Sequence, residues 1–295
     1  MTEETPIRPP HRGLKKGLYV IPTLFTAANI GMGFLAVISS IRGYHASFTD
    51  VALAAHYFDT AALGIGLAIL FDTLDGRVAR ATHTATEIGV QFDSLADVLT
   101  FGLAPATLMY AWALGGAFDE TGRVHGFGLF LLFMFLMCGA FRLARFNLLA
   151  TRPRVLAEGN VKVDKRYFVG LPIPPAGGLL AALVHFSPEP LIAMGKETAQ
   201  LYTYCLLAIV AILGILMVSK IRYFSFKSTG AGMQGFFTVL GVAAFVTAVY
   251  LYSQYALLLV AGVYSAHGLV LWVLRAIFLK PTMHGDIDGE TATDQ

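Results

Sequence analysis

The sequence predicts an all-α integral membrane protein with about eight transmembrane helices. Of its 295 residues, 56% are hydrophobic and only 14% are charged, and the mean hydropathy is +0.65. The apolar residues also gather in runs long enough to cross a bilayer. A water-soluble globular domain carries roughly 25% charged residues, so the composition excludes that class. The net charge of +2 gives no support to nucleic-acid binding.

The first apolar run covers residues 18–41 and follows a basic N-terminal segment, residues 1–17. This run stays uncharged for 24 residues, whereas the apolar part of a signal peptide has roughly 7 to 15. The sequence therefore predicts a retained first membrane helix.

Seven further apolar runs follow, separated by polar or charged breaks. They lie at about 51–74, 94–117, 126–149, 168–187, 200–219, 235–252 and 256–279. The fifth run predicts the weakest helix, because it opens with Gly170-Leu171-Pro172-Ile173-Pro174-Pro175.

The basic residues predict the orientation, because cytoplasmic loops retain positive charge. With the N-terminus inside, all but three of the 21 Lys and Arg residues fall on the cytoplasmic side. The three exceptions are Arg42, Arg123 and Lys196. We therefore expect an even number of helices and a cytoplasmic C-terminal tail, residues 281–295, which is polar, acidic and mobile.

Four carboxylates lie where the second run ends and the third begins. Asp72 and Asp75 are spaced i, i+3, and Asp93 and Asp97 are spaced i, i+4, so each pair lies on one helical face. The two helices run in opposite directions, which brings both pairs to a similar depth. The sequence predicts that they converge.

Clustered carboxylates at a membrane edge need cations to persist, because they repel one another and are costly to remove from water. An all-oxygen ligand set suits a hard divalent ion, Mg²⁺ or Mn²⁺, better than zinc. Two such ions would bind pyrophosphate oxygens and favour in-line displacement at phosphorus. Helix capping or pairing with nearby arginines is the alternative interpretation.

These residues form a pattern of eight fixed positions: Asp72-x2-Asp75-Gly76-x2-Ala79-Arg80-x8-Gly89-x3-Asp93-x3-Asp97. The pattern resembles the complete signature of the CDP-alcohol phosphotransferases. The resemblance implies that family's membrane fold, a homodimer, and a metal centre made by the four aspartates. It also implies that Asp97 takes the proton from the acceptor hydroxyl, and that Gly76, Ala79 and Arg80 bind the CDP-lipid.

Other segments resemble the phosphatidylserine synthase branch of this family. They are Ser94 to Ala106, Ile21 to Asn29, Arg142 to Asn147, Gly170 to Pro174 and Leu216 to Tyr223. The resemblance implies transfer of a phosphatidyl group from CDP-diacylglycerol to L-serine, giving phosphatidylserine and CMP. Glycerol 3-phosphate, choline or an inositol phosphate is the alternative acceptor within the family.

Arg142 and Arg145 are an i, i+3 pair at the predicted cytoplasmic end of the fourth helix. A guanidinium group suits a carboxylate because it can donate two parallel hydrogen bonds, so both arginines are candidates for binding the serine carboxylate. Anchoring at the membrane surface is the other interpretation.

The predicted organisation is thus a membrane catalytic domain over residues 18–280 in a bacterial cell membrane, with the active site facing the cytoplasm. An ion-coupled transporter is the alternative from another class. Its only polar support away from the aspartates is His56 and Asp59, near the outer end of the second helix. A purely structural scaffold does not explain the eight signature positions.

Overall fold

The computed structural model describes residues 12–81, 87–151, 167–224 and 233–278. The predicted C-terminal tail and most of the predicted N-terminal segment lie outside the described residues. Side chains of some helical residues, including Ala79 and Arg80, also lie outside the description.

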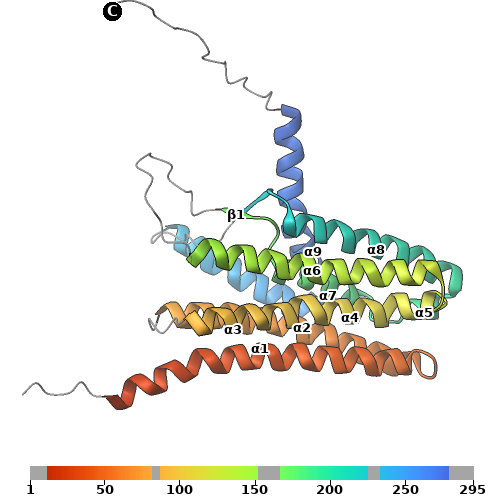
Figure 1. Ribbon diagram of the computed structural model, residues 1–295, viewed down its shortest axis with the longest axis horizontal. Coiled ribbons are helices and arrows are strands. Elements are labelled where there is room, and N and C mark those ends of the chain that lie inside the picture. Colours follow the sequence, from red (N-terminus) through yellow and green to blue (C-terminus); the bar gives the residue numbers. More distant parts are fainter. Residues whose placement is uncertain (1–11, 82–86, 152–166, 225–232, 279–295) are drawn as a thin grey trace, which may run out of the picture.

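The described chain is almost entirely helical (Figure 1). The helices are α1 (Arg12–Ala46), α2 (Val51–Ala81), α3 (Glu87–Asp97), α4 (Ala104–Met109), α5 (Gly115–Ala117), α6 (Arg123–Thr151), α7 (Ile173–Phe186), α8 (Lys196–Val218) and α9 (Met233–Phe278). Three irregular helical turns are η1 (Val98–Leu103), η2 (Tyr110–Leu114) and η3 (Leu191–Met194). One antiparallel strand pair, β1 (Tyr167–Val169) with β2 (Arg222–Phe224), joins the loop before α7 to the loop after α8.

Six described helical segments are long and apolar enough to cross a membrane. They are Leu24–Ala46, Val51–Val78, Ile88–Ala117, Arg123–Leu148, Lys196–Val218 and Leu251–Leu271. Large apolar side chains point outward along them, such as Phe34, Ile215 and Leu259, which are 67%, 69% and 65% exposed. Such surfaces are unfavourable in water and suit lipid, so the predicted class, an all-α integral membrane protein, is confirmed.

The predicted number of eight helices is not reached by these six segments. The fifth predicted run gives only the 14 residues of α7, about 21 Å of helix against a hydrocarbon core of about 30 Å. Gly170 has a positive φ of 80° and Pro172 is extended, so the chain becomes helical only at Ile173. The seventh run forms the first half of α9, where most side chains lie outside the description.

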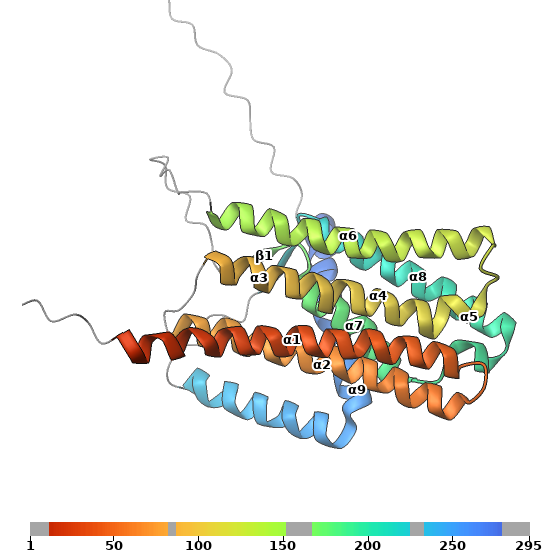
Figure 2. The ribbon, with the colours of Figure 1, turned by 60° about the horizontal axis from the view of Figure 1, so that its bottom comes forward.

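The long helices lie side by side, with the segment from α3 to α5 at the centre (Figures 1 and 2). In an apolar 18-residue window of the Ile88–Ala117 span, 72% of the residues are buried, against 11% to 44% in the corresponding windows of the other five. This central helix contains two π-helical turns, η1 and η2, the second following Pro105, which cannot donate a backbone hydrogen bond. The helix begins at Glu87 rather than near residue 94, so Asp93 lies within a helix and not at its edge.

α1 and α2 pack antiparallel with a defined register. A Cβ atom on Gly43 would lie 2.7 Å from the ring of Phe58, and one on Gly64 would lie 3.3 Å from the carbonyl oxygen of Met32. Glycine at these positions lets the two backbones approach closely.

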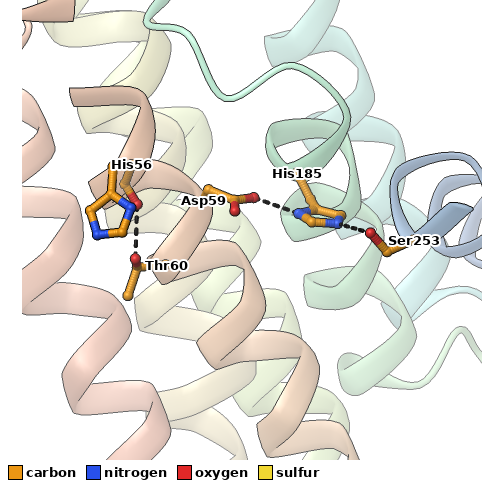
Figure 3. Close-up of polar contacts among 5 residues, drawn as sticks. All are labelled: His56, Asp59, Thr60, His185 and Ser253. Carbon is orange, nitrogen blue, oxygen red and sulfur yellow. Dashed lines mark hydrogen bonds and ion pairs between the residues drawn. The ribbon is translucent and has the colours of Figure 1, made fainter. Parts of the chain in front are cut away.

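α9 changes direction at Tyr252, where φ is −142° and ψ is 53°. Its second half crosses the direction of the other long helices (Figures 1 and 2) and packs on α7. Figure 3 shows a chain of polar contacts that reaches Ser253, the residue after this bend. His185 of α7 contacts Asp59 of α2 through Nδ1 at 2.5 Å and Ser253 of α9 through Nε2 at 2.9 Å.

Close packing of α7 on the central helix makes a stability prediction. A Cβ atom on Gly177 would lie 2.7 Å from the carbonyl oxygen of Phe101, so Gly177→Ala is expected to cost about 1 to 3 kcal/mol through overpacking. Thermal unfolding in detergent measures the effect. Gly66→Ala is the matched control, because Gly66 has nothing within 4 Å of its Cβ position. Equal melting temperatures for the two variants would contradict the close contact.

Candidate active site

Three of the four predicted metal ligands meet at one place. Asp72, near the end of α2, approaches Asp93 and Asp97 of α3, and one carboxylate oxygen from each lies within 4.8 Å of the others. Asp97 is the most enclosed of the three, at 8% exposure, and Asp72 and Asp93 are half-buried. The sequence spacing predicted this convergence.

The fourth carboxylate, that of Asp75, lies beside this cluster but has a protein partner of its own. The hydroxyl of Thr26 on α1 donates a hydrogen bond to Asp75 Oδ2, and Asp75 is 6% exposed. It remains close enough to Asp72 and Asp93 to repel both. Thr26 thus holds one carboxylate at the edge of the acidic centre.

The cluster fits a divalent cation. Oδ1 of Asp93 and Oδ1 of Asp97 are buried and have no hydrogen-bond partner among the described residues. Buried carboxylates that face each other without partners are costly, and oxygen donors alone suit Mg²⁺ or Mn²⁺. A cation would satisfy these oxygens and cancel their mutual repulsion.

The structure separates the two arginines that the sequence treated alike. Arg142 is 8% exposed, and its Nε has no hydrogen-bond partner in the described part of the chain. It lies within electrostatic reach of Asp97 and of Tyr264 on α9. Arg142 is therefore a cation beside the acidic centre, and its Nε–H group is available to donate a hydrogen bond.

Arg145 has a different environment. Its guanidinium group donates to the carbonyl oxygens of Val218, at 3.2 Å, and Val169, at 3.4 Å. These bonds join α6 to the end of α8 and to β1. Of the two candidates, Arg142 is the one that lies near Asp97.

The predicted CDP-lipid residues lie on the last turns of α2. Gly76 follows Asp75 directly and is half-buried, and its role in binding the CDP-lipid stays a prediction. The side chains of Ala79 and Arg80 lie outside the description, and their roles stay predictions.

Sequence reasoning assigned no role to two residues that border the centre. Thr26 binds Asp75, and Tyr264 lies near Arg142. Thr26 stands in the segment that resembles the serine branch, so a signal for it existed. Tyr264 lies more than 150 residues from the acidic signature, and no local pattern connects the two.

An apolar groove of about 890 Å³ runs between α2, α7 and the second half of α9. Thr73, the neighbour of Asp72, lines it, as do Leu70, Gly178, Leu259 and Tyr264. The groove thus begins beside the acidic centre and extends to His185. Its volume and apolar walls suit hydrocarbon chains.

The two residues that favoured a transporter do not form a path for ions. Asp59 is paired with His185, and His56 contributes its carbonyl oxygen to the hydroxyl of Thr60 at 2.8 Å (Figure 3). The partner of Asp59 is thus His185 of α7. Asp59 itself lies on α2, more than three helical turns before Asp72.

Comparison with known sequences decides the family. Residues 19–216 match the CDP-alcohol phosphatidyltransferase family. The chain belongs to the CDP-alcohol phosphatidyltransferase family. The family predicted from the acidic signature is therefore confirmed, and the signature lies within the matched region.

Three relatives of this CDP-alcohol phosphatidyltransferase illustrate the branch. The CDP-diacylglycerol–serine O-phosphatidyltransferase of Helicobacter pylori strain 26695 is 34% identical over 266 residues, covering 89% of this chain and 96% of the relative. The Bacillus subtilis protein of the same name is 30% identical, with 72% and 93% covered. The archaetidylserine synthase of Methanothermobacter thermautotrophicus is 31% identical, with 72% of each chain covered.

Proposed function

We propose that this membrane enzyme transfers the phosphatidyl group from CDP-diacylglycerol to L-serine, giving phosphatidylserine and CMP. The observation that carries the proposal is the acidic centre with Arg142 at its wall and an apolar groove leading away from it. The names of the three relatives support serine as the acceptor.

Each part of this arrangement has a place in the reaction. The acyl chains of the lipid would lie in the groove, and Gly76, Ala79 and Arg80 would bind the CDP group. Asp72, Asp75, Asp93 and Asp97 would hold divalent metal, Mn²⁺ or Mg²⁺ and by family resemblance two ions, which stabilises negative charge on the phosphate oxygens.

The acceptor would meet Asp97 and Arg142. A serine hydroxyl is a weak nucleophile at neutral pH, so Asp97 accepts its proton as the hydroxyl oxygen attacks phosphorus. A new bond forms between that oxygen and phosphorus, and the bond to the CMP oxygen breaks. Arg142 binds the serine carboxylate and fixes the hydroxyl near Asp97.

The proposed site faces the cytoplasm. Arg42, Arg123 and Lys196, the three basic residues expected outside, belong to the end of α1 and the starts of α6 and α8. These helix ends lie together, opposite the end that carries the acidic centre (Figure 1). The catalytic unit would cover residues 18–280, flanked by cytoplasmic segments 1–17 and 281–295, and family resemblance favours a homodimer.

CMP release by the purified protein tests the function. CDP-diacylglycerol is supplied with Mn²⁺ or Mg²⁺ and with L-serine, glycerol 3-phosphate, choline or inositol phosphate in turn. We expect release only with serine and metal, and no release after chelation of the metal. CMP release with another acceptor but not with serine would contradict serine as the substrate. No CMP release with any of the four acceptors would contradict the proposed transfer.

A further inference from the structure

Asn29 of α1 is a buried polar residue whose side chain makes no hydrogen bond to the described residues. Its side chain is 0% exposed, and neither Nδ2 nor Oδ1 has a hydrogen-bond partner among the described residues. Nearly all buried amide groups in folded proteins are hydrogen-bonded, and leaving one unpaired is costly. The unpaired carboxamide therefore indicates that Asn29 gains a hydrogen-bond partner when the site is occupied.

The helix register places Asn29 against the acidic centre. Thr26 contacts Asp75 in the same antiparallel register as the Gly43–Phe58 contact. Asn29 lies three residues after Thr26, and Asp72 lies three residues before Asp75. One helical turn along each helix thus sets Asn29 opposite Asp72.

A second contact brings Asn29 to the other side of the centre. The hydroxyl of Thr100 donates to the carbonyl oxygen of Asn29 at 3.2 Å, and Thr100 lies one turn after Asp97. A Cβ atom on Gly33, one turn further along α1, would come within 3.0 Å of the Thr100 Cα, so α1 lies directly against the central helix here. The part of α1 that carries Asn29 therefore packs against the turn after Asp97, and its register on α2 sets Asn29 at the level of Asp72.

We propose that Asn29 is a positioning residue of the metal centre, whose carboxamide, unpaired among the described residues without metal, becomes a hydrogen-bond partner of the Asp72 carboxylate when a divalent cation is bound. The inference rests on the metal site of the proposed function. The amide Nδ2 can donate to the carboxylate oxygen that does not face the cation, and it adds no charge to a cluster that already repels itself. Hydrogen bonds of this kind orient metal ligands in many proteins.

A purely structural role for Asn29 predicts a different response to mutation. If the amide stabilised the helix packing, its removal would lower the stability of the metal-free protein. If it serves the metal centre, its removal eliminates an unpaired buried group and leaves the metal-free protein as stable or more stable. The sign of the change in melting temperature distinguishes the two roles.

The experiment uses the full chain in detergent, with the Mn²⁺ dissociation constant from calorimetry and melting temperatures with and without Mn²⁺. Asn29→Leu is expected to bind Mn²⁺ about 10- to 100-fold more weakly without a loss of metal-free melting temperature. Asn29→Asp adds a carboxylate to the cluster, so we expect a lower metal-free melting temperature and a larger gain on adding Mn²⁺.

Ser40→Ala is the matched control on the same helix, because the buried Ser40 hydroxyl donates to the Ala36 carbonyl oxygen of α1 itself, at 2.7 Å. It should leave Mn²⁺ affinity unchanged. Mn²⁺ affinity of Asn29→Leu within about twofold of wild type would overturn the inference. If that variant does not fold, Asn29→Asp with a wild-type melting temperature and Mn²⁺ response would overturn it instead.

These outcomes are separate from the failure of the proposed function. Wild-type protein that binds Mn²⁺ but releases no CMP with serine would overturn the reaction and leave the role of Asn29 intact. Serine-dependent release by the wild type, together with unchanged Mn²⁺ binding by Asn29→Leu, would overturn only the inference.

Discussion

Asp97→Asn is expected to abolish serine-dependent CMP release while leaving CDP-diacylglycerol bound. The asparagine side chain has the same shape but cannot accept the proton of the serine hydroxyl, and loss of a general base costs about 10²- to 10⁴-fold in rate. Asp97 is buried, and its Oδ1 has no hydrogen-bond partner in the described chain, so the substitution removes no hydrogen bond at that oxygen. CMP release rates and binding of labelled CDP-diacylglycerol measure the two effects.

Asp50→Asn is the matched control for that substitution. Asp50 precedes α2, far from the acidic centre, and its Oδ1 accepts a hydrogen bond from the backbone of Leu53 at 3.0 Å. Asparagine caps a helix about as well as aspartate, so activity should stay at the wild-type level. Retention of more than a few per cent of activity by Asp97→Asn would show that another group takes the proton.

Arg142→Gln is expected to raise the KM for serine about 10- to 100-fold. A hydrogen bond to a charged partner contributes about 1.5 to 3 kcal/mol, and the neutral amide cannot replace the charge that binds the serine carboxylate. The KM of Arg142→Lys for serine should lie between those of the wild type and Arg142→Gln, because lysine keeps the charge but not the paired donors. Steady-state kinetics at saturating CDP-diacylglycerol separate the KM for serine from kcat.

Arg145→Gln is the informative comparison. Arg145 donates to the backbone of Val218 and Val169, so its loss should lower the melting temperature and change the KM for serine much less. If Arg142→Gln lowered kcat with an unchanged KM for serine, Arg142 would serve to balance the charge of Asp97 and not to bind the acceptor.

Much of this protein could be predicted from its sequence, because the relevant information is local. Run length and hydropathy predict membrane helices, since every backbone polar group must be satisfied within the bilayer. The i, i+3 and i, i+4 spacing of Asp72 with Asp75 and of Asp93 with Asp97 predicts shared helical faces. Two consecutive antiparallel helices then bring Asp72, Asp93 and Asp97 together.

Helix length at the fifth run was less predictable. Composition shows a spanning stretch, but the positive φ of Gly170 and the extended Pro172 delay the helix to Ile173. The bend at Tyr252 has no proline to signal it, and the contact of Ser253 beside it with His185 involves a residue of another helix.

The sequence by itself determined the membrane class, the family and the acidic centre, whereas tertiary structure decided which neighbours complete that centre. Local spacing could not separate Arg142 from Arg145, because both lie near one end of α6 and only their contacts with other elements differ. Thr26 joins the centre through the register of α1 on α2. Periodicity describes the face of one helix, but the register between two helices depends on side-chain packing across their interface.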